Sequence, residues 1–130
     1  MLRLGVVVIG VSDAERAAGF YARALGYRRY PLDRVEDGFV VLAPPDGGPL
    51  LALDEVGGPP ADRPRVHLDL HAPDAEAMHA EVERLVTLGA RRVDWDGYPT
   101  DPAAHNYDAY VVLADPEGNL FCVVDDTRAP

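Results

Sequence analysis

The chain has 130 residues, 48% of them hydrophobic, which is enough to bury a core as one domain or as two closely packed half-domains. Its formal net charge of −10 argues against a nucleic-acid partner, because that charge repels phosphate backbones. The single cysteine, Cys122, excludes an intramolecular disulfide, and no apolar run reaches the roughly 18 residues of a membrane span. Since no charged-then-apolar leader is present either, we expect a cytoplasmic protein with no membrane contact.

The first half of the chain is predicted to form one strand, one helix and three further strands. Residues 2–11 are a near-continuous, valine-rich run that is typical of a mostly buried strand. A helix follows, with Ser12 or Asp13 as its N-cap and Gly26 at its end. Turn residues then separate three short strands, at residues 28–32, 38–43 and 50–56.

The second half repeats this order of elements. Residues 57–64 are the clearest linker, because their prolines and glycines suit neither a helix nor a strand. After the linker, residues 65–71 alternate as a strand, and residues 73–88 form a helix with Pro73 near its first turn. Three more strands are predicted at residues 91–95, 109–114 and 120–125. The predicted organisation is therefore a module at 1–56, a linker at 57–64 and a second module at 65–130.

Direct sequence identity supports this duplication. The segment FVVLAPPDG at residues 39–47 recurs 71 residues later as YVVLADPEG at residues 110–118, with six identities in nine positions. The helices also begin alike, with Asp-Ala-Glu at residues 13–15 and again at 74–76, and both end on Leu-Gly. The chain is thus predicted to be two copies of one module.

The copies differ in one loop. Residues 96–107 form a stretch of about a dozen residues where the first copy has only residues 33–37. Loops of this length are uncommon in compact domains and are often lids or binding loops. The loop is either a mobile surface excursion or a cover from which Tyr98, His105 and Tyr107 overhang a pocket.

Two βαβββ modules in tandem resemble the vicinal oxygen chelate superfamily, which includes glyoxalase I, extradiol dioxygenases and bleomycin-resistance proteins. The resemblance is carried by the Phe20-Tyr21 pair before Leu25-Gly26, by the strand RVHLDL at residues 65–70 and by ADPEGN at residues 114–119. Within the superfamily, the second half looks like the glyoxalase-like domain group. The resemblance implies an α+β fold in which the two modules form an open, cup-shaped barrel, and it implies a homodimer.

The resemblance also implies where a metal would bind. In the metal-dependent members each module lends two ligands, typically a His or Gln from its first strand and a Glu from its last. At most two of these four positions carry donors here, and one donor is a thiol, so we expect neither a metal centre of the family type nor another cofactor. The positions fall at His67, at Cys122 or Leu120, at Val6, and at Ala52 or Leu53.

His67, Asp69 and His71 alternate along one predicted strand and therefore share one face. Burying an imidazole and a carboxylate without partners would cost several kcal/mol. The pair His67 and Asp69 is then either a satisfied structural network, or a polar floor for a ligand, or a general base whose pKa the carboxylate tunes. Cys122 lies in an apolar strand, which favours an inert thiol over a redox or ligand role.

Two functional hypotheses follow. The first is a small-molecule binding protein of the bleomycin-resistance type, which holds an aromatic or apolar ligand in a metal-free cup. The second is a glyoxalase-like lyase or isomerase that uses His67 as acid or base, with an atypical metal as an option. The expected ligand-binding residues are His67, Asp69, Trp95, Tyr98, His105, Tyr107, Tyr110, Leu120 and Cys122.

Overall fold

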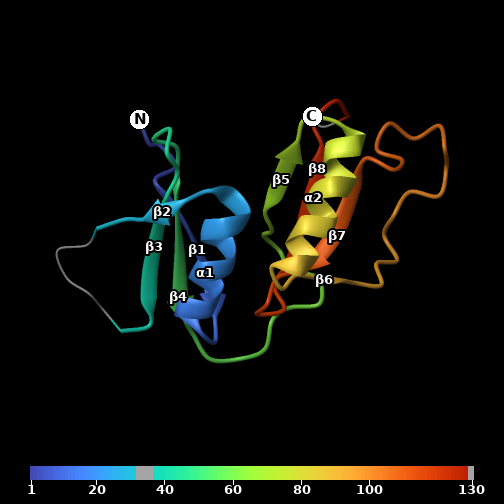
Figure 1. Cartoon of the computed structure of the whole chain (residues 1–130). Helices are drawn as coiled ribbons and strands as arrows, with labels where there is room; N and C mark the ends of the chain where they lie inside the picture. Colours follow the sequence, from blue (N-terminus) through green and yellow to red (C-terminus); the bar gives the residue numbers. More distant parts are fainter. Residues whose placement is uncertain (32–36, 129–130) are drawn as a thin grey trace. The chain divides into compact units, whose positions relative to one another are not determined.

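The computed structural model describes residues 1–31 and 37–128. Contacts divide the chain into two compact units, Met1–Pro59 and Pro60–Pro130. In the described residues each unit contains one helix and one four-stranded sheet (Figure 1). The α+β class and the two βαβββ modules predicted from the sequence are confirmed.

The first unit has a sheet in the order β1-β4-β3-β2, with β1 parallel to β4 and the other neighbours antiparallel. Its helix begins after Asp13, whose carboxylate accepts a hydrogen bond from the Arg16 N–H, and ends at Gly26 with a left-handed φ of 69°. The elements are β1 (Val6–Val11), α1 (Ala14–Leu25), β2 (Arg28–Arg29), β3 (Phe39–Ala43) and β4 (Leu50–Glu55).

The second unit repeats this topology in the order β5-β8-β7-β6, again with one parallel pair, β5 and β8. Asp74 is the N-cap of its helix and accepts from the Ala77 N–H at 2.8 Å. The elements are β5 (Asp69–Ala72), α2 (Ala75–Thr87), β6 (Arg91–Arg92), β7 (Tyr110–Ala114) and β8 (Leu120–Asp125).

The strand registers of the two units also correspond. Arg28 pairs with Ala43 in the first sheet as Arg91 pairs with Ala114 in the second. Along the parallel pairs, Val8 stands opposite Ala52 and Asp69 stands opposite Cys122. The counterparts of His67, Asp69 and Cys122 in the first unit are therefore Val6, Val8 and Ala52.

Four strands differ from the predicted bounds by more than one residue at an end, and all four lie at sheet edges. The strand predicted at 2–11 begins at Val6, that at 65–71 begins at Asp69, and that at 91–95 ends at Arg92. The strand predicted at 28–32 ends at Arg29, and its expected end, Leu32, lies outside the described residues. An edge strand ends where its single neighbour stops pairing, and side-chain alternation carries no information about that point.

Each helix packs its apolar face on the sheet of its own unit. Phe20 and Tyr21 are both 1% exposed, as expected for a helix that covers β3 and β4. In the second unit Met78, Val82 and Leu85 are buried, and α2 contacts β8 and β5. The prediction of a mostly buried first strand is wrong for part of β1, because Val6 and Val8 are 43% and 51% exposed. Neither helix of the described chain has the length and hydropathy needed to cross a membrane.

Candidate functional site

A cavity of about 540 Å³ lies within the second unit. Its wall combines apolar strand residues, a histidine with a carboxylate, and two arginines. Its size falls in the range of small-molecule sites. The lining residues are Arg63, Pro64, His67, Asp69, Trp95, His105, Asn106, Ala109, Tyr110, Val112, Leu120, Phe121, Cys122, Val124 and Arg128.

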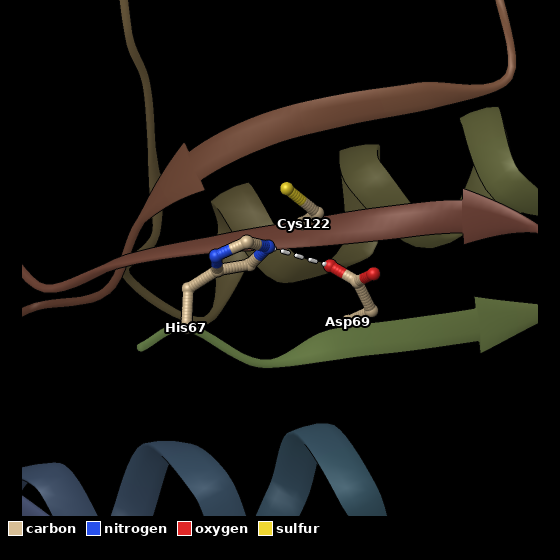
Figure 2. A group of neighbouring side chains, drawn as sticks. All are labelled: His67, Asp69 and Cys122. Atoms are coloured by element: carbon tan, nitrogen blue, oxygen red, sulfur yellow. Dashed lines mark ion pairs between the residues drawn. The ribbon is translucent and has the colours of Figure 1, made fainter. Parts of the chain in front are cut away.

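Three side chains with donor atoms meet on one wall of this cavity. Asp69 begins β5 and pairs in register with Cys122 of β8, so that their side chains lie next to each other. His67, two residues before Asp69, points along the same face, and its Nε2 lies 3.0 Å from Asp69 Oδ1. The ligand atoms of the three residues all lie within 4.8 Å of one another. Figure 2 shows the three side chains next to one another, with the ion pair between His67 and Asp69 as a dashed line.

Cys122 is held in its protonated form by this environment. Burial raises the pKa of the Cys122 thiol to about 12, and the negative charge of Asp69 and a hydrogen bond to it contribute to the same shift. A thiol is a nucleophile only as its thiolate. At neutral pH, Cys122 is therefore a hydrogen-bond partner of Asp69 and not a nucleophile.

His67 has one ring nitrogen engaged and one available. In the tautomer that carries its hydrogen on Nε2, His67 donates to Asp69 Oδ1 and keeps a lone pair on Nδ1. The side chains of both residues are about half-exposed, at 46% and 50%. This pair satisfies the structural-network interpretation of the sequence and also has the arrangement that a general base requires.

The apolar part of the cavity wall includes two aromatic rings, Trp95 and Tyr110. They pack against the buried cluster of Val112, Cys122 and Val124. Tyr110 directs its hydroxyl away to the Gly97 carbonyl at 3.3 Å. The cavity thus joins flat apolar surface to a small polar wall.

Two arginines line the same cavity. The Arg63 guanidinium lies 4.8 Å from the centre of the Trp95 ring and forms an ion pair with Asp96. Arg128 donates from Nε and Nη2 to the backbone carbonyl of His105, at 3.0 and 2.9 Å. The cavity wall therefore carries two positively charged side chains, although the chain as a whole is acidic.

The structure brings seven of the nine residues expected from the sequence into the cavity lining, and these are His67, Asp69, Trp95, His105, Tyr110, Leu120 and Cys122. Tyr98 and Tyr107 are not part of the lining. The Tyr98 hydroxyl accepts a hydrogen bond from the Val112 N–H at 2.8 Å, and burial raises the pKa of this phenol. Tyr107 is half-buried, and its N–H donates to the Ala104 carbonyl in a turn of the loop.

Sequence reasoning missed several lining residues for different reasons. Val112 and Val124 share the strand face of Tyr110 and Cys122, so alternation along β7 and β8 was a usable signal for both. Arg63 falls in the predicted linker and Arg128 follows the last strand. Nothing in the local pattern around either arginine indicates that the chain returns to the cavity.

A metal centre of the type that the resemblance implies does not fit these residues. The counterparts of His67, Asp69 and Cys122 are Val6, Val8 and Ala52, and none of these side chains has a donor atom. The second unit alone offers a nitrogen, an oxygen and a sulfur close together. Such a set could hold an ion that accepts mixed ligands, Zn²⁺ for example, with one position open.

Comparison with known proteins gives one family. Residues 6–124 match the family model described as a glyoxalase-like domain. No curated protein matches the sequence.

Solved structures share the fold over nearly the whole chain. A member of the glyoxalase/bleomycin resistance protein/dioxygenase superfamily from Sphaerobacter thermophilus is 22% identical, with a TM-score of 0.67 and 97% and 98% of the two chains covered. A family enzyme from Burkholderia phytofirmans is 19% identical, with a TM-score of 0.68 and 94% and 97% covered. The genomically encoded fosfomycin resistance protein of Listeria monocytogenes is 14% identical, with a TM-score of 0.68 and 96% and 91% covered. At these identities the likeness shows the fold alone.

Proposed function

Because the chain belongs to the glyoxalase-like domain family, in the glyoxalase/bleomycin resistance/dioxygenase superfamily, we propose that it binds a small organic molecule in the second-unit cavity. The ligand has an aromatic or apolar body. One observation carries the proposal: a cavity of about 540 Å³ has Trp95 and Tyr110 in its wall and the polar pair His67 and Asp69 beside them.

The two rings explain why an apolar body would bind. Trp95 and Tyr110 are only partly buried, so each keeps surface that a ligand can cover. Aromatic pairs contribute about 0.5–1.5 kcal/mol beyond the burial of their area. Nine of the fifteen lining residues are apolar or aromatic and six are polar or charged, so the apolar wall can hold the body of a ligand while the polar groups orient it.

Trp95 is the only tryptophan of the chain, so its fluorescence reports on the cavity alone. Titration with aromatic metabolites is expected to quench or shift this emission. Tyr110→Leu should weaken binding about tenfold, since it removes one ring contact. Tyr30→Leu is the matched control, because Tyr30 is 45% exposed and lies in the first unit. Emission that is unchanged by every ligand, together with measurable turnover, would overturn the proposal.

A second candidate function is favoured by the state of His67. The free Nδ1 lone pair, with Asp69 behind Nε2, suits removal of a proton next to a carbonyl group by a glyoxalase-like lyase or isomerase. Deuterium incorporation from heavy water into hydroxycarbonyl compounds tests this function. Incorporation that is present in the wild type and lost in His67→Gln would support it, and incorporation that survives the substitution would exclude it.

We also keep two proposals about the surroundings of the protein. The family resemblance supports a homodimer. The single cysteine supports a reducing cytoplasm.

A further inference from the structure

We infer that the ligand of the second-unit cavity is an organic monoanion whose carboxylate binds the guanidinium of Arg128. The inference rests on the proposed function, because it concerns the same cavity, and it adds the chemical class of the ligand.

The geometry of Arg128 carries the first step. Its Nε and Nη2 atoms, which form one edge of the guanidinium, both donate to the His105 carbonyl. The other edge, formed by Nη1 and Nη2, has no hydrogen-bond or ion-pair partner among residues 1–31 and 37–128. The loop backbone therefore fixes the plane of the guanidinium and leaves a fork of donors available at the cavity.

The charge of Arg128 carries the second step. The carbonyl of His105 is neutral, so it orients the guanidinium without compensating its charge. Arg63, the other cavity arginine, is compensated by Asp96 and lies against Trp95. Asp69, the carboxylate in the lining, is engaged by His67 and by the Cys122 thiol. Among the described residues no carboxylate compensates the positive charge of Arg128, so a bound anion can do so.

The chemical class follows from geometry and from net charge. A carboxylate presents two oxygens in one plane, which match the free edge with two parallel hydrogen bonds. The chain carries a net charge of −10, so a second negative charge on the ligand would add repulsion. A singly charged carboxylate therefore fits better than a phosphate or phosphonate dianion, and the flat body of the same molecule would lie on Trp95 and Tyr110.

Matched probe pairs test the inference on the full chain. Benzoate, phenylacetate and cinnamate are compared with their primary amides by calorimetric titration and by Trp95 fluorescence. We expect the acids to bind about tenfold more tightly than the amides, because a hydrogen bond to a charged group exceeds a neutral one by this order, and solvent at the exposed Arg128 limits the gain.

Three substitutions isolate the charge. Arg128→Gln keeps a donor for the His105 carbonyl and should remove the preference for the acids, because it lowers their affinity far more than that of the amides. Arg128→Lys should keep part of the preference. Arg84→Gln is the control, because Arg84 pairs with Glu81 on α2 and is not part of the cavity.

Each other outcome has a defined meaning. Equal binding of acids and amides by the wild type would refute the anion inference and leave the proposed function standing. Binding of neither class would overturn the proposed function and the inference together. An Arg128→Gln chain that loses affinity for acids and amides alike would show that Arg128 only supports the structure. Phenylphosphonate binding more tightly than benzoate would refute the assignment to a carboxylate.

Discussion

Asp69 contacts two groups of different chemistry, the imidazole of His67 and the thiol of Cys122. The carboxylate favours the protonated state of the thiol and holds the imidazole in place through an ion-pair contact at 3.0 Å. The Asp69 side chain therefore affects how the polar wall binds a ligand or a metal, and how fast the Cys122 thiol reacts with alkylating reagents.

Asp69→Asn is expected to increase the reactivity of Cys122. The substitution removes the negative charge that helps to raise the pKa of the thiol to about 12, while burial, the larger cause, remains. The pKa should therefore fall but stay above its ordinary value of 9.0. The rate of alkylation by iodoacetamide, followed by mass spectrometry, measures the change. The assay is run between about pH 8 and 10, because an ordinary thiol titrates in this range.

The control for this prediction is Asp126→Asn. Asp126 pairs with His71 at 2.9 Å and is not part of the cavity lining. Equal alkylation rates in the wild type and in Asp69→Asn would contradict the role given to Asp69.

The sign of the pH effect on stability follows from the same shift in the pKa of Cys122. The contribution of the thiol to the free energy of unfolding is present below pH 9.0 and is lost as the pH rises toward about 12.

The donor set predicts that the purified protein carries less than one metal ion per chain. Among the described residues only the second unit has such a cluster of donors, and the counterparts of His67 and Cys122 are Val6 and Ala52. The three donors are the minimum for a zinc site with one open position, but His67 and Asp69 bind each other, and the Cys122 thiol, with a pKa of about 12, must lose its proton before it binds an ion. Elemental analysis measures the content. A stoichiometric ion that disappears in His67→Ala would contradict the expectation.

Among single residues, the sequence reveals those that lie on regular strands. Asp69, Tyr110 and Cys122 follow from alternation along segments whose pairing the repeat makes clear, and His67, two residues before β5, continues the alternation of Asp69. Arg128 could not be predicted, because its place depends on a hydrogen bond to His105, which is 23 residues away in the sequence.

At the scale of elements, the turn between β7 and β8 depends on a buried carboxylate. Asp115 is 0% exposed, and its Oδ1 accepts from the N–H groups of Glu117 and Asn119, both at 2.9 Å. The matching turn of the first unit uses Asp46, which is exposed and accepts from the Gly48 N–H at 3.3 Å. The same segment of the repeat thus has a buried turn in one unit and an open turn in the other.

Asp115→Ala should lower the free energy of unfolding by about 2–3 kcal/mol, because two half-buried N–H groups would lose a charged acceptor. Asp46→Ala, in the corresponding turn of the first unit, should cost less than about 1 kcal/mol, since water can replace an exposed carboxylate. Urea denaturation followed by circular dichroism measures both. Similar losses in the two variants would show that burial does not determine the importance of this turn.

The loop between β6 and β7 is longer than the sequence suggests. Because β6 ends at Arg92, the irregular segment covers residues 93–109, and Figure 1 shows it as the long orange excursion beside β7. It brings Trp95, His105, Asn106 and Ala109 to the cavity, whereas Tyr98 turns to the Val112 N–H. The presence of a long loop was predictable, but its start and the direction of each side chain were not, since no period governs an irregular segment.

For the whole molecule, the internal repeat was sufficient to predict the fold. Two segments with six identities in nine positions occupy β3 and β7 and the turns that follow them, and the two sheets have the same strand order. The repeat could not show which side chains are buried in one half and exposed in the other, or what they contact, because the same backbone pattern accommodates either set of side chains.

The proposed homodimer gives the last prediction. Light scattering with size-exclusion chromatography should report a mass twice the 14.1 kDa of one chain. Val6 and Val8 on the edge strand β1 are exposed, and an apolar edge of this kind favours association. The mass should be insensitive to salt if apolar contacts hold the copies together. A mass of one chain at all concentrations would contradict the homodimer.

The exchange of Val6, Val8 and Ala52 for His67, Asp69 and Cys122 within one backbone pattern has a practical consequence. Main-chain pairing between the first and last strands sets the register in both units. These three positions can therefore carry different side chains without a change in the backbone. The apolar half shows that the scaffold does not need the polar trio. The three polar residues can therefore be redesigned for another ligand while the fold is left intact. The residues at the corresponding positions of the first unit show which apolar side chains the fold accepts there.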